Sequence, residues 1–269
     1  MSKKQTEKIP TIIGVIPARF ASTRLMGKPL ADIGGKPMMQ HTYESALKSK
    51  LLHKVILAVD DEKVFQVARN FGAEVMLTPK DVPTGSDRIA LVARKYDNAE
   101  IIVNIQGDEP FISGVMIDQA IEPLLFDKTV SVSTLARKIE TLEELQSPSV
   151  VKVVFDYKNF AMYFSRSPIP FVRDANNKDE ILEKTDIYKH IGLYVYRREY
   201  LLKFTQLAPT DLENIEKLEQ LRMLENGFRI KIVVTEFDSF SVDTPEDLDR
   251  ARRIFTMLKN PENVNENTW

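Results

Sequence analysis

The chain has 269 residues and nearly balanced charge, with 37 basic and 39 acidic side chains and a formal net charge of -2. This balance gives no sign of a nucleic-acid-binding surface, and the absence of cysteine excludes disulfides, thiolate metal sites and a cysteine nucleophile. No apolar run approaches the roughly 18 residues of a membrane-spanning helix, and the polar N-terminus lacks a signal-peptide core. We therefore expect a cytoplasmic globular protein that binds neither nucleic acid nor membrane.

The first hundred residues alternate predicted strands with predicted helices. The segment at 11–17 is short, nearly all apolar and rich in β-branched residues, as expected of a strand buried on both faces. Further strands are predicted at 54–59, 73–77 and 100–105, and helices at 37–48, 61–72 and 86–96. Strands separated by helices of this length favour a parallel sheet with right-handed crossovers.

Beyond Val130 this alternation becomes less regular. Strands are predicted at 131–137, 150–156, 160–166, 190–197 and 229–235, helices at 211–225 and from near 244, and a polar loop or short helix at 173–186. We expect one α/β domain over residues 10–259 with a mostly parallel sheet and a smaller β-rich lobe around 130–205. Residues 1–9 and 260–269 are expected to be flexible tails.

The segment IPARFASTRLMGKPL, residues 16–30, follows the first predicted strand and contains cations without acids. The cations are Arg19, Arg24 and Lys28. Loops at the carboxyl ends of parallel strands form ligand sites, so the segment suits a phosphate-bearing anion, with Ser22 and Thr23 as further donors. It matches neither of the two glycine-rich nucleotide motifs, Walker A and G-x-G-x-x-G. A solvated surface loop with screened charges is the alternative.

Two aspartates follow predicted strands and could hold a divalent cation. Asp108 lies in EIIVNIQGDEP and Asp243 in SVDTPEDLDR. Mg²⁺ favours one or two carboxylates together with phosphate oxygens and water. Either acid could instead serve a turn, and Thr244 to Asp247 read as the capped start of a helix, which leaves Asp243 unexplained.

Taken together and in order, these segments resemble the 3-deoxy-manno-octulosonate cytidylyltransferase (CMP-KDO synthetase) family. The resemblance runs from about Ile12 to Leu258 and includes PTGSDRIA, NIQGDEP, YFSRSPIP, HIGLYVYR, LEQLRMLENG and VDTPEDL. In the basic loop the family usually carries proline where Met26 stands here. The resemblance implies a Rossmann-like nucleotidyltransferase fold and a homodimer formed by the β-rich lobe.

The family's nucleotide and metal roles transfer to matching positions of this chain. Arg19, Arg24 and Lys28 would hold the phosphates of CTP, and residues 84–88 would cradle its cytosine: Thr84, Gly85, Ser86, Asp87 and Arg88. Capping of a helix is the other explanation for Ser86 and Asp87. Asp108 and Asp243 would bind Mg²⁺.

The family's sugar-binding positions correspond to Gln106, Arg166, His190, Glu219 and Gln220. A guanidinium such as that of Arg166 pairs well with the sugar carboxylate. His190 could instead be an ordinary hydrogen-bonded strand residue. Glu219 and Gln220 could lie on the polar face of a helix whose core stripe is Leu212, Ile215, Leu218, Leu221 and Leu224.

The implied reaction is direct: the C2 hydroxyl of KDO attacks the α-phosphorus of CTP, and pyrophosphate leaves, with charge stabilised by Mg²⁺, Lys28 and the arginines. The product would supply lipopolysaccharide assembly. Three alternatives stay open: a cytidylyltransferase for 8-amino-KDO or sialic acid, a UTP-dependent sugar-1-phosphate enzyme, and a nucleotide-binding protein without catalysis. The presence of both Asp108 and Asp243 argues against the last of these.

Overall fold

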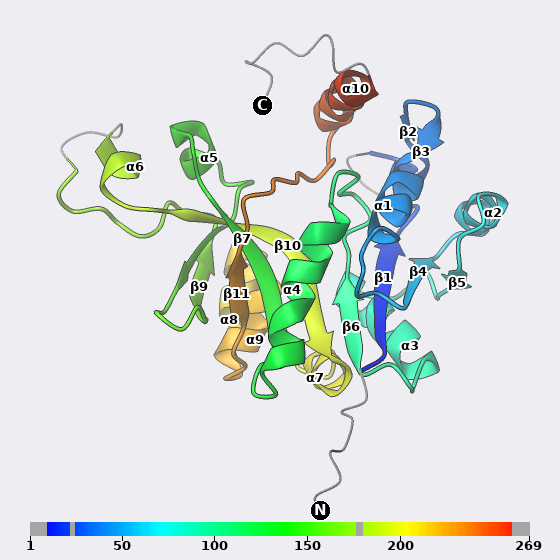
Figure 1. The fold of residues 1–269 in the computed structure, drawn as a ribbon, viewed down its shortest axis with the longest axis horizontal. Helices are drawn as coiled ribbons and strands as arrows, with labels where there is room; N and C mark the ends of the chain where they lie inside the picture. Colours follow the sequence, from blue (N-terminus) through cyan, green and yellow to red (C-terminus); the bar gives the residue numbers. More distant parts are fainter. Residues whose placement is uncertain (1–9, 22–24, 176–179, 260–269) are drawn as a thin grey trace, which may run out of the picture.

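The computed structural model describes residues 10–21, 25–175 and 180–259, which fold around one mixed sheet (Figure 1). Its main path runs β11-β7-β10-β6-β1-β4-β5, and β8 and β9 attach beside β10. The strands are β1 (Ile12–Ala18), β4 (Lys54–Val59), β5 (Val75–Leu77), β6 (Ile101–Asn104), β7 (Val132–Lys138), β8 (Lys152–Phe155), β9 (Ala161–Ser165), β10 (Tyr188–Arg197) and β11 (Lys231–Val234). Strand β1 pairs in parallel with β4 and β6, and the predicted α/β fold is confirmed.

Helices cover both faces of the sheet. The longer ones are α1 (Met38–Ala46), α2 (Glu62–Asn70), α3 (Gly85–Lys95), α4 (Gly114–Phe126), α7 (Arg198–Phe204) and α10 (Pro245–Lys259). The shorter ones are η1 (Lys28–Leu30), α5 (Leu142–Gln146), α6 (Glu180–Lys184), α8 (Asp211–Glu216) and α9 (Gln220–Glu225). Buried side chains of α1, α2 and α4 pack on one face of the sheet, and those of α3, α7 and α9 on the other. Among these described helices, none combines the length and apolar character needed to cross a bilayer.

Strand β1 runs through the middle of this three-layer arrangement. Ile12 and Ile16 join the core beside α1 and α4, whereas Ile13 and Val15 join the core beside α3. Because neighbouring residues of a strand point to opposite faces, a strand covered on both sides must be apolar throughout. This explains the nearly all-apolar run at 11–17 and leaves the polar loop that follows at the sheet edge.

Strand β10 reverses direction within the sheet and contains an irregularity. It is antiparallel to β6 on one side and to β7 on the other. His190 lies opposite Ala136 and Tyr194 lies opposite Thr134, so four residues along β10 span two along β7. The strand is therefore bulged around Gly192 and Leu193.

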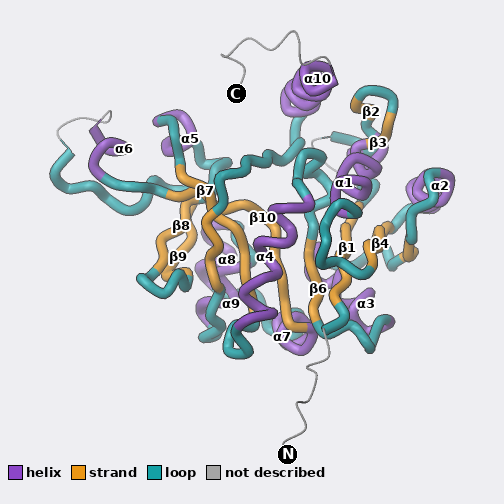
Figure 2. The backbone as a smooth tube through the Cα atoms, in the orientation of Figure 1, coloured by secondary structure: helices purple, strands orange, loops and turns teal. Residues whose placement is uncertain are grey.

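The strands of the 130–205 region do not form a separate sheet. Strands β7 and β10 lie inside the main sheet, while β8 pairs with β10 and β9 extends the pairing outward. Figure 2 shows β8, β9 and α6 projecting from the side of the molecule away from β5. The assignment of this region to dimerisation stays a prediction.

The prediction of a single helix at 211–225 is wrong, because this segment forms two helices, α8 and α9. Lys217 ends α8 in the left-handed region, at φ 53° and ψ 46°. The expected core stripe is interrupted as a result: Leu212 and Ile215 are 37% and 76% exposed, whereas Leu218 and Leu221 are buried. A left-handed residue ends a helix by turning the backbone away from its axis.

Helix α10 and a small hairpin, β2 (Asp32–Ile33) and β3 (Lys36–Pro37), bring the C-terminal segment to the sheet edge. Ile33 and Met38 form a separate apolar cluster with Val242, Leu248 and Ala251. The Asp247 carboxylate accepts from the Thr244 N–H at 2.9 Å and the Thr244 hydroxyl at 3.0 Å, which confirms the predicted capped helix start. The segment that carries Asp243 is thereby fixed.

Candidate active site

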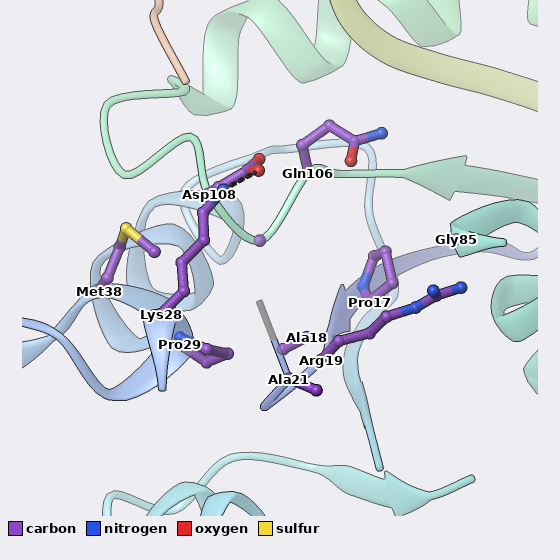
Figure 3. A pocket seen from close by; sticks show the side chains of 11 residues that line it. Pro17, Ala18, Arg19, Ala21, Lys28, Pro29, Met38, Gly85, Gln106 and Asp108 are labelled. Atoms are coloured by element: carbon purple, nitrogen blue, oxygen red, sulfur yellow. Dashed lines mark hydrogen bonds and ion pairs between the residues drawn. The ribbon is translucent and has the colours of Figure 1, made fainter. Parts of the chain in front are cut away.

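A cavity of about 340 Å³ opens where β1 and β6 end, the edge at which parallel strands present ligand sites. This volume lies within the usual range for small-molecule pockets. Its lining residues are Pro17, Ala18, Arg19, Ala21, Lys28, Pro29, Met38, Gly85, Gln106, Gly107 and Asp108. Figure 3 shows Lys28 reaching toward Asp108 while Arg19 extends the other way, toward Gly85. The basic segment, the α3 start and the NIQGDEP segment therefore face one space.

The two predicted metal-binding aspartates meet at a single cation. The Lys28 Nζ donates to Asp108 Oδ2 at 2.6 Å and to Asp243 Oδ1 at 2.7 Å. The three residues are separated by 80 and 215 positions, so only the fold brings them together. A backbone hydrogen bond of 2.8 Å from the Val242 N–H to the Asp108 carbonyl joins the two acidic segments directly.

The ammonium of Lys28 is held strongly in its charged form. Burial alone would lower the pKa of Lys28, but the charges and hydrogen bonds of Asp108 and Asp243 outweigh burial and raise this pKa above 10.5. Two carboxylates that share one monovalent cation retain one negative charge between them. This pair can therefore accept a more highly charged cation in place of the ammonium.

Arg19 is the other described cation of the basic segment. Its Nη2 atom is buried without a hydrogen-bond partner among the described residues. A buried guanidinium nitrogen that lacks an acceptor fits an anion at this position. Ser22, Thr23 and Arg24 lie outside the described residues.

The start of α3 is rigidly capped, and the capping explanation holds for Asp87. Thr84 and Asp87 form a reciprocal capping box. Ser86 instead donates its hydroxyl to Glu219 Oε2 at 2.7 Å. Gly85 lines the cavity beside Pro17, and so the backbone of this turn rather than its side chains faces the cavity.

Arg88 differs from its sequence-based assignment. Its side chain is 0% exposed, and its described hydrogen bonds go to Thr78, Pro79 and Asp60 inside the protein. A guanidinium enclosed in this way does not reach the base. Arg88 is therefore removed from the residues expected to contact nucleotide directly.

Gln106 and His190 lie on adjacent strands beside the cavity. Gln106 Nε2 donates to the Gly192 carbonyl on β10 at 3.3 Å. His190 Nε2 lies 2.9 Å from the hydroxyl oxygen of Thr134, whose own proton goes to the Leu193 carbonyl at 2.7 Å. Nε2 therefore carries the imidazole hydrogen, and Nδ1 is the acceptor. Burial lowers the pKa of His190 to about 3, so the ring is neutral at physiological pH.

Glu219 and Gln220 are not the exposed polar-face residues that helical periodicity allows. Gln220 is buried at 7% exposure. One Glu219 oxygen accepts from Ser86, while Oε1 is buried without a described hydrogen bond and lies 3.8 Å from Arg222 Nη2 in an ion pair. Burial raises the pKa of Glu219, against the opposing effect of its hydrogen bonds. Its contact with Ser86 connects α9 to the cavity wall at α3.

Sequence reasoning missed Tyr194, whose buried hydroxyl has no partner among the described residues. Its ring lies 5.3 Å from that of His190 between centroids. The residue stands in the quoted HIGLYVYR segment, but alternation alone does not distinguish it from a core aromatic. Its unpaired hydroxyl beside His190 is the signal that only the fold supplies.

Arg166 is committed to protein acceptors in this structure. Its Nε donates to the Glu216 carbonyl at 2.7 Å, Nη1 to the Pro148 carbonyl at 2.9 Å, and Nη2 to the Lys217 carbonyl at 3.4 Å. Three of its five N–H groups are thus occupied, and the others can serve an acid. The break between α8 and α9 supplies two of these carbonyls.

Glu109 is a buried acid next to Asp108. Burial and the Asp108 charge raise the pKa of Glu109 to about 7, despite a 2.9 Å hydrogen bond from Ser239. That bond ties the segment before Asp243 to the NIQGDEP turn. Within the described ranges, no group of three or more histidines or acids is arranged to hold a metal by itself.

Comparisons with known proteins identify the family. A family profile described as cytidylyltransferase matches residues 13–232. The chain is 54% identical over 244 residues to the 3-deoxy-manno-octulosonate cytidylyltransferase of Geotalea daltonii, covering 89% of this chain and 96% of that one. It belongs to this family. The enzyme of the same name from Solibacter usitatus is 52% identical, covering 91% and 94% of the two chains.

Solved structures agree with this assignment. A CMP:2-keto-3-deoxy-manno-octonic acid synthetase complexed with CTP superposes with a TM-score of 0.86 and 39% identity, over 92% of this chain and 99% of that one. A 4-diphosphocytidyl-2C-methyl-D-erythritol synthase from Anaerococcus prevotii has a TM-score of 0.59 and 15% identity, over 93% and 100%. The second likeness shows the fold alone.

Proposed function

We propose that this chain transfers the cytidylyl group of CTP to 3-deoxy-manno-octulosonate, releasing pyrophosphate and activating the sugar for lipopolysaccharide assembly. The observation that carries the proposal is the meeting of Lys28, Asp108 and Asp243 at the wall of a cavity that also contains Arg19. Membership of the cytidylyltransferase family supports the nucleotide and the sugar.

The residues present fit a magnesium ion. Asp108 and Asp243 converge from separate segments on one cation position, which matches the preference of Mg²⁺ for one or two carboxylates plus phosphate and water oxygens. Asp108 and Asp243 would hold this ion. When bound, Mg²⁺ would neutralise phosphate charge and make the attacking hydroxyl more acidic.

Lys28 and Arg19 would bind the triphosphate. Asp108 and Asp243 would hold the metal, and the Lys28 ammonium would donate to phosphate oxygens, where negative charge increases as pyrophosphate leaves. The unpaired Nη2 of Arg19 would donate from the opposite wall. Further donors to the phosphates in this proposal are Ser22, Thr23 and Arg24. The cytosine would be contacted by Thr84, Gly85 and Ser86.

The acceptor sugar would lie between β6, β10 and α9. Neutral His190 would accept a hydrogen bond from a sugar hydroxyl at Nδ1. The Tyr194 hydroxyl, which has no hydrogen-bond partner among the described residues, and the Glu219 carboxylate would bind other sugar hydroxyls. Gln106 and Gln220 would orient the ring, and the two free N–H groups of Arg166 would bind the carboxylate. The reaction needs no covalent intermediate, because the two substrates would be held side by side.

Pyrophosphate release with a substrate panel tests this function. We expect turnover with CTP, KDO and Mg²⁺, and little with UTP, a sugar 1-phosphate or sialic acid, while 8-amino-KDO reports on the nearest alternative. Asp108→Ala should abolish turnover and retain the fold by circular dichroism. Asp249→Ala, which removes an exposed acid from α10, is the matched control. Nucleotide binding with no release from any acceptor would identify a non-catalytic binder.

We also propose a homodimer formed by the 130–205 region. Three large, mainly apolar side chains in the described part of this region are strongly exposed: Tyr157, Met162 at 66% and Phe171 at 88%. Exposed apolar groups of this size are common where a second subunit covers them.

A further inference from the structure

Asp60 has a buried carboxylate at the carboxyl end of β4, behind the cavity wall. The residue is 7% exposed. Its Oδ1 accepts from the backbone N–H of Phe20 at 2.9 Å, and its Oδ2 accepts from Arg88 Nη2 at 3.2 Å. A buried charge is stable only when it is paired in this way, so the contacts of Asp60 are strongly determined.

Phe20 and Gly27 are hydrogen-bonded to each other across the basic segment, and we call this pair the neck of the segment. The N–H of Phe20 is held by Asp60, and its carbonyl accepts from the N–H of Gly27 at 3.2 Å. Gly27 has φ 67°, a left-handed conformation that glycine adopts without strain, and the chain then enters η1 at Lys28. The position of Phe20 therefore determines the positions of two cations. Arg19 directly precedes Phe20, and Lys28 directly follows Gly27.

Arg88 attaches the same carboxylate to α3. Its guanidinium is enclosed by Asp60, the Thr78 hydroxyl and the Pro79 carbonyl, the last at 3.2 Å. Arg88 lies one turn after Gly85, so its position follows the capped start of the helix. The carboxylate of Asp60 thus connects the basic segment, through Phe20, to the start of α3, through Arg88.

We propose that Asp60 and Arg88 are positioning residues. They hold the neck of the basic segment at a fixed position relative to the start of α3, so that one nucleotide contacts both the basic segment and the start of α3. The inference rests on the proposed function, because it assumes that CTP occupies this cavity. Neither residue lines the cavity. Both therefore act through the backbone they hold, and Arg88 acts through Asp60.

The test compares Asp60→Ala, Arg88→Met and the double variant, using CTP binding by calorimetry together with separate KM values for CTP and KDO. We expect Asp60→Ala to weaken CTP binding roughly tenfold or more, because small displacements in a site of this kind have large effects, with the KM for KDO unchanged. The double variant should be no worse than Asp60→Ala, because coupled residues are not additive. Arg88→Lys should recover part of the Arg88→Met loss.

Glu74→Ala is the matched control, since it removes an acid paired at 2.8 Å with Lys54 at the opposite end of β4. It should leave the affinity for CTP unchanged. If Asp60→Ala does not fold, Arg88→Met and Arg88→Lys provide the same comparison. Unchanged CTP affinity, an equal rise in both KM values, or an additive double variant would overturn the inference. Failure of the wild-type chain to make CMP-KDO would overturn the proposed function, whereas CTP affinity would still report on Asp60.

Discussion

Lys28 occupies the position between Asp108 and Asp243 that a divalent ion would take. Its contacts of 2.6 and 2.7 Å leave the carboxylates no closer partner among the hydrogen bonds described for them. Under the proposed function, metal binding would have to displace an ammonium, and the displaced ammonium would become available to phosphate. The three side chains would therefore couple metal binding to nucleotide binding.

Replacement of Lys28 by methionine should separate these two roles. Without the competing ammonium, Lys28→Met should bind Mn²⁺, a magnetic substitute for Mg²⁺, more tightly in the absence of CTP, by roughly tenfold for a ~1.4 kcal/mol change. Electron paramagnetic resonance measures this affinity. Turnover should fall by more than about tenfold, since a transition-state charge contact is lost.

Lys36→Met is the control for the Lys28 variant, because Lys36 pairs with Glu44 in a half-exposed position away from both aspartates. Its Mn²⁺ affinity should equal that of the wild type. Equal affinity in Lys28→Met would show that the ammonium does not compete for the carboxylates.

His190 should make stability depend on pH in the acid range. The folded chain holds this imidazole neutral down to a pKa of about 3, whereas the unfolded chain protonates it near 6.5. The unfolded state binds more protons between these values, so the free energy of unfolding falls by about 1.4 kcal/mol per pH unit as pH drops below 6.5.

Urea titrations of the wild type and of His190→Gln between pH 4 and 7 measure this effect. The slope of the unfolding free energy against pH should differ between the two proteins by about 1.4 kcal/mol per pH unit, which corresponds to one proton. Parallel curves for both proteins would contradict a neutral, buried imidazole.

Several single residues could be predicted from sequence, and others could not. Asp243 lies well beyond the end of β11 and reaches Asp108 through an irregular segment, but Asp108 comes soon after β6, so its place at the carboxyl edge of the sheet follows from pattern. The burial of Arg88 does not, because its partner Asp60 lies 28 residues away and becomes a neighbour only when β4 and α3 pack. The unpaired Tyr194 hydroxyl is likewise a property of tertiary structure.

At the scale of elements, the break between α8 and α9 is the main departure from periodicity. Leucines at helical spacing predict one continuous helix, yet Lys217 adopts a left-handed conformation. A continuous helix would bury one stripe of leucine and isoleucine side chains. The break between α8 and α9 instead exposes Ile215 and places the carbonyls of Glu216 and Lys217 against Arg166. Tertiary hydrogen bonds thus override local helix preference here.

Replacement of Lys217 by glycine should stabilise the protein by up to about 1 kcal/mol, because glycine adopts the left-handed conformation without the strain of a side chain. Thermal unfolding measures the change. Lys203→Gly, inside α7, is the opposite control and should destabilise by roughly 0.5–1 kcal/mol. A loss of stability in Lys217→Gly would show that the lysine side chain contributes more than the strain.

The turn after β6 depends on Gly107. A Cβ at this position would lie 2.6 Å from the Pro17 carbonyl oxygen, too close for the backbone of β1 to tolerate. Gly107→Ala should therefore destabilise by about 1–3 kcal/mol and displace Asp108, with loss of turnover. Gly85→Ala is the stability control, since its nearest contact would be 3.8 Å. Equal melting temperatures for both variants would refute the close approach.

At the scale of the whole molecule, the fold class and the alternation of strands with helices in the first hundred residues follow from the sequence, because buried parallel strands and amphipathic helices have distinct periods. The integration of the 130–205 strands into the main sheet does not. Antiparallel pairing of β10 with β6 joins residues 90 or more positions apart along the chain, and hydrophobic alternation does not specify which strands pair.

The proposed dimer predicts that Phe171→Glu will shift the chain toward monomer, because a charge would be buried at the interface. Sedimentation velocity measures the association state. Phe126→Glu alters another exposed phenylalanine, at the end of α4 and outside this region, and should leave association unchanged. Identical sedimentation of all three proteins would place the interface elsewhere.

Under the proposed function, the irregular pairing in β10 would decide which aromatic side chains can contact the same sugar. In an even strand, residues four positions apart stand about 13 Å from each other, too far for both to touch one pyranose. Two extra residues at Gly192 and Leu193 shorten that interval, and the His190 and Tyr194 rings lie 5.3 Å apart. A regular ladder that kept all of these residues would return the two side chains to that spacing, and the proposed acceptor could then contact only one of them.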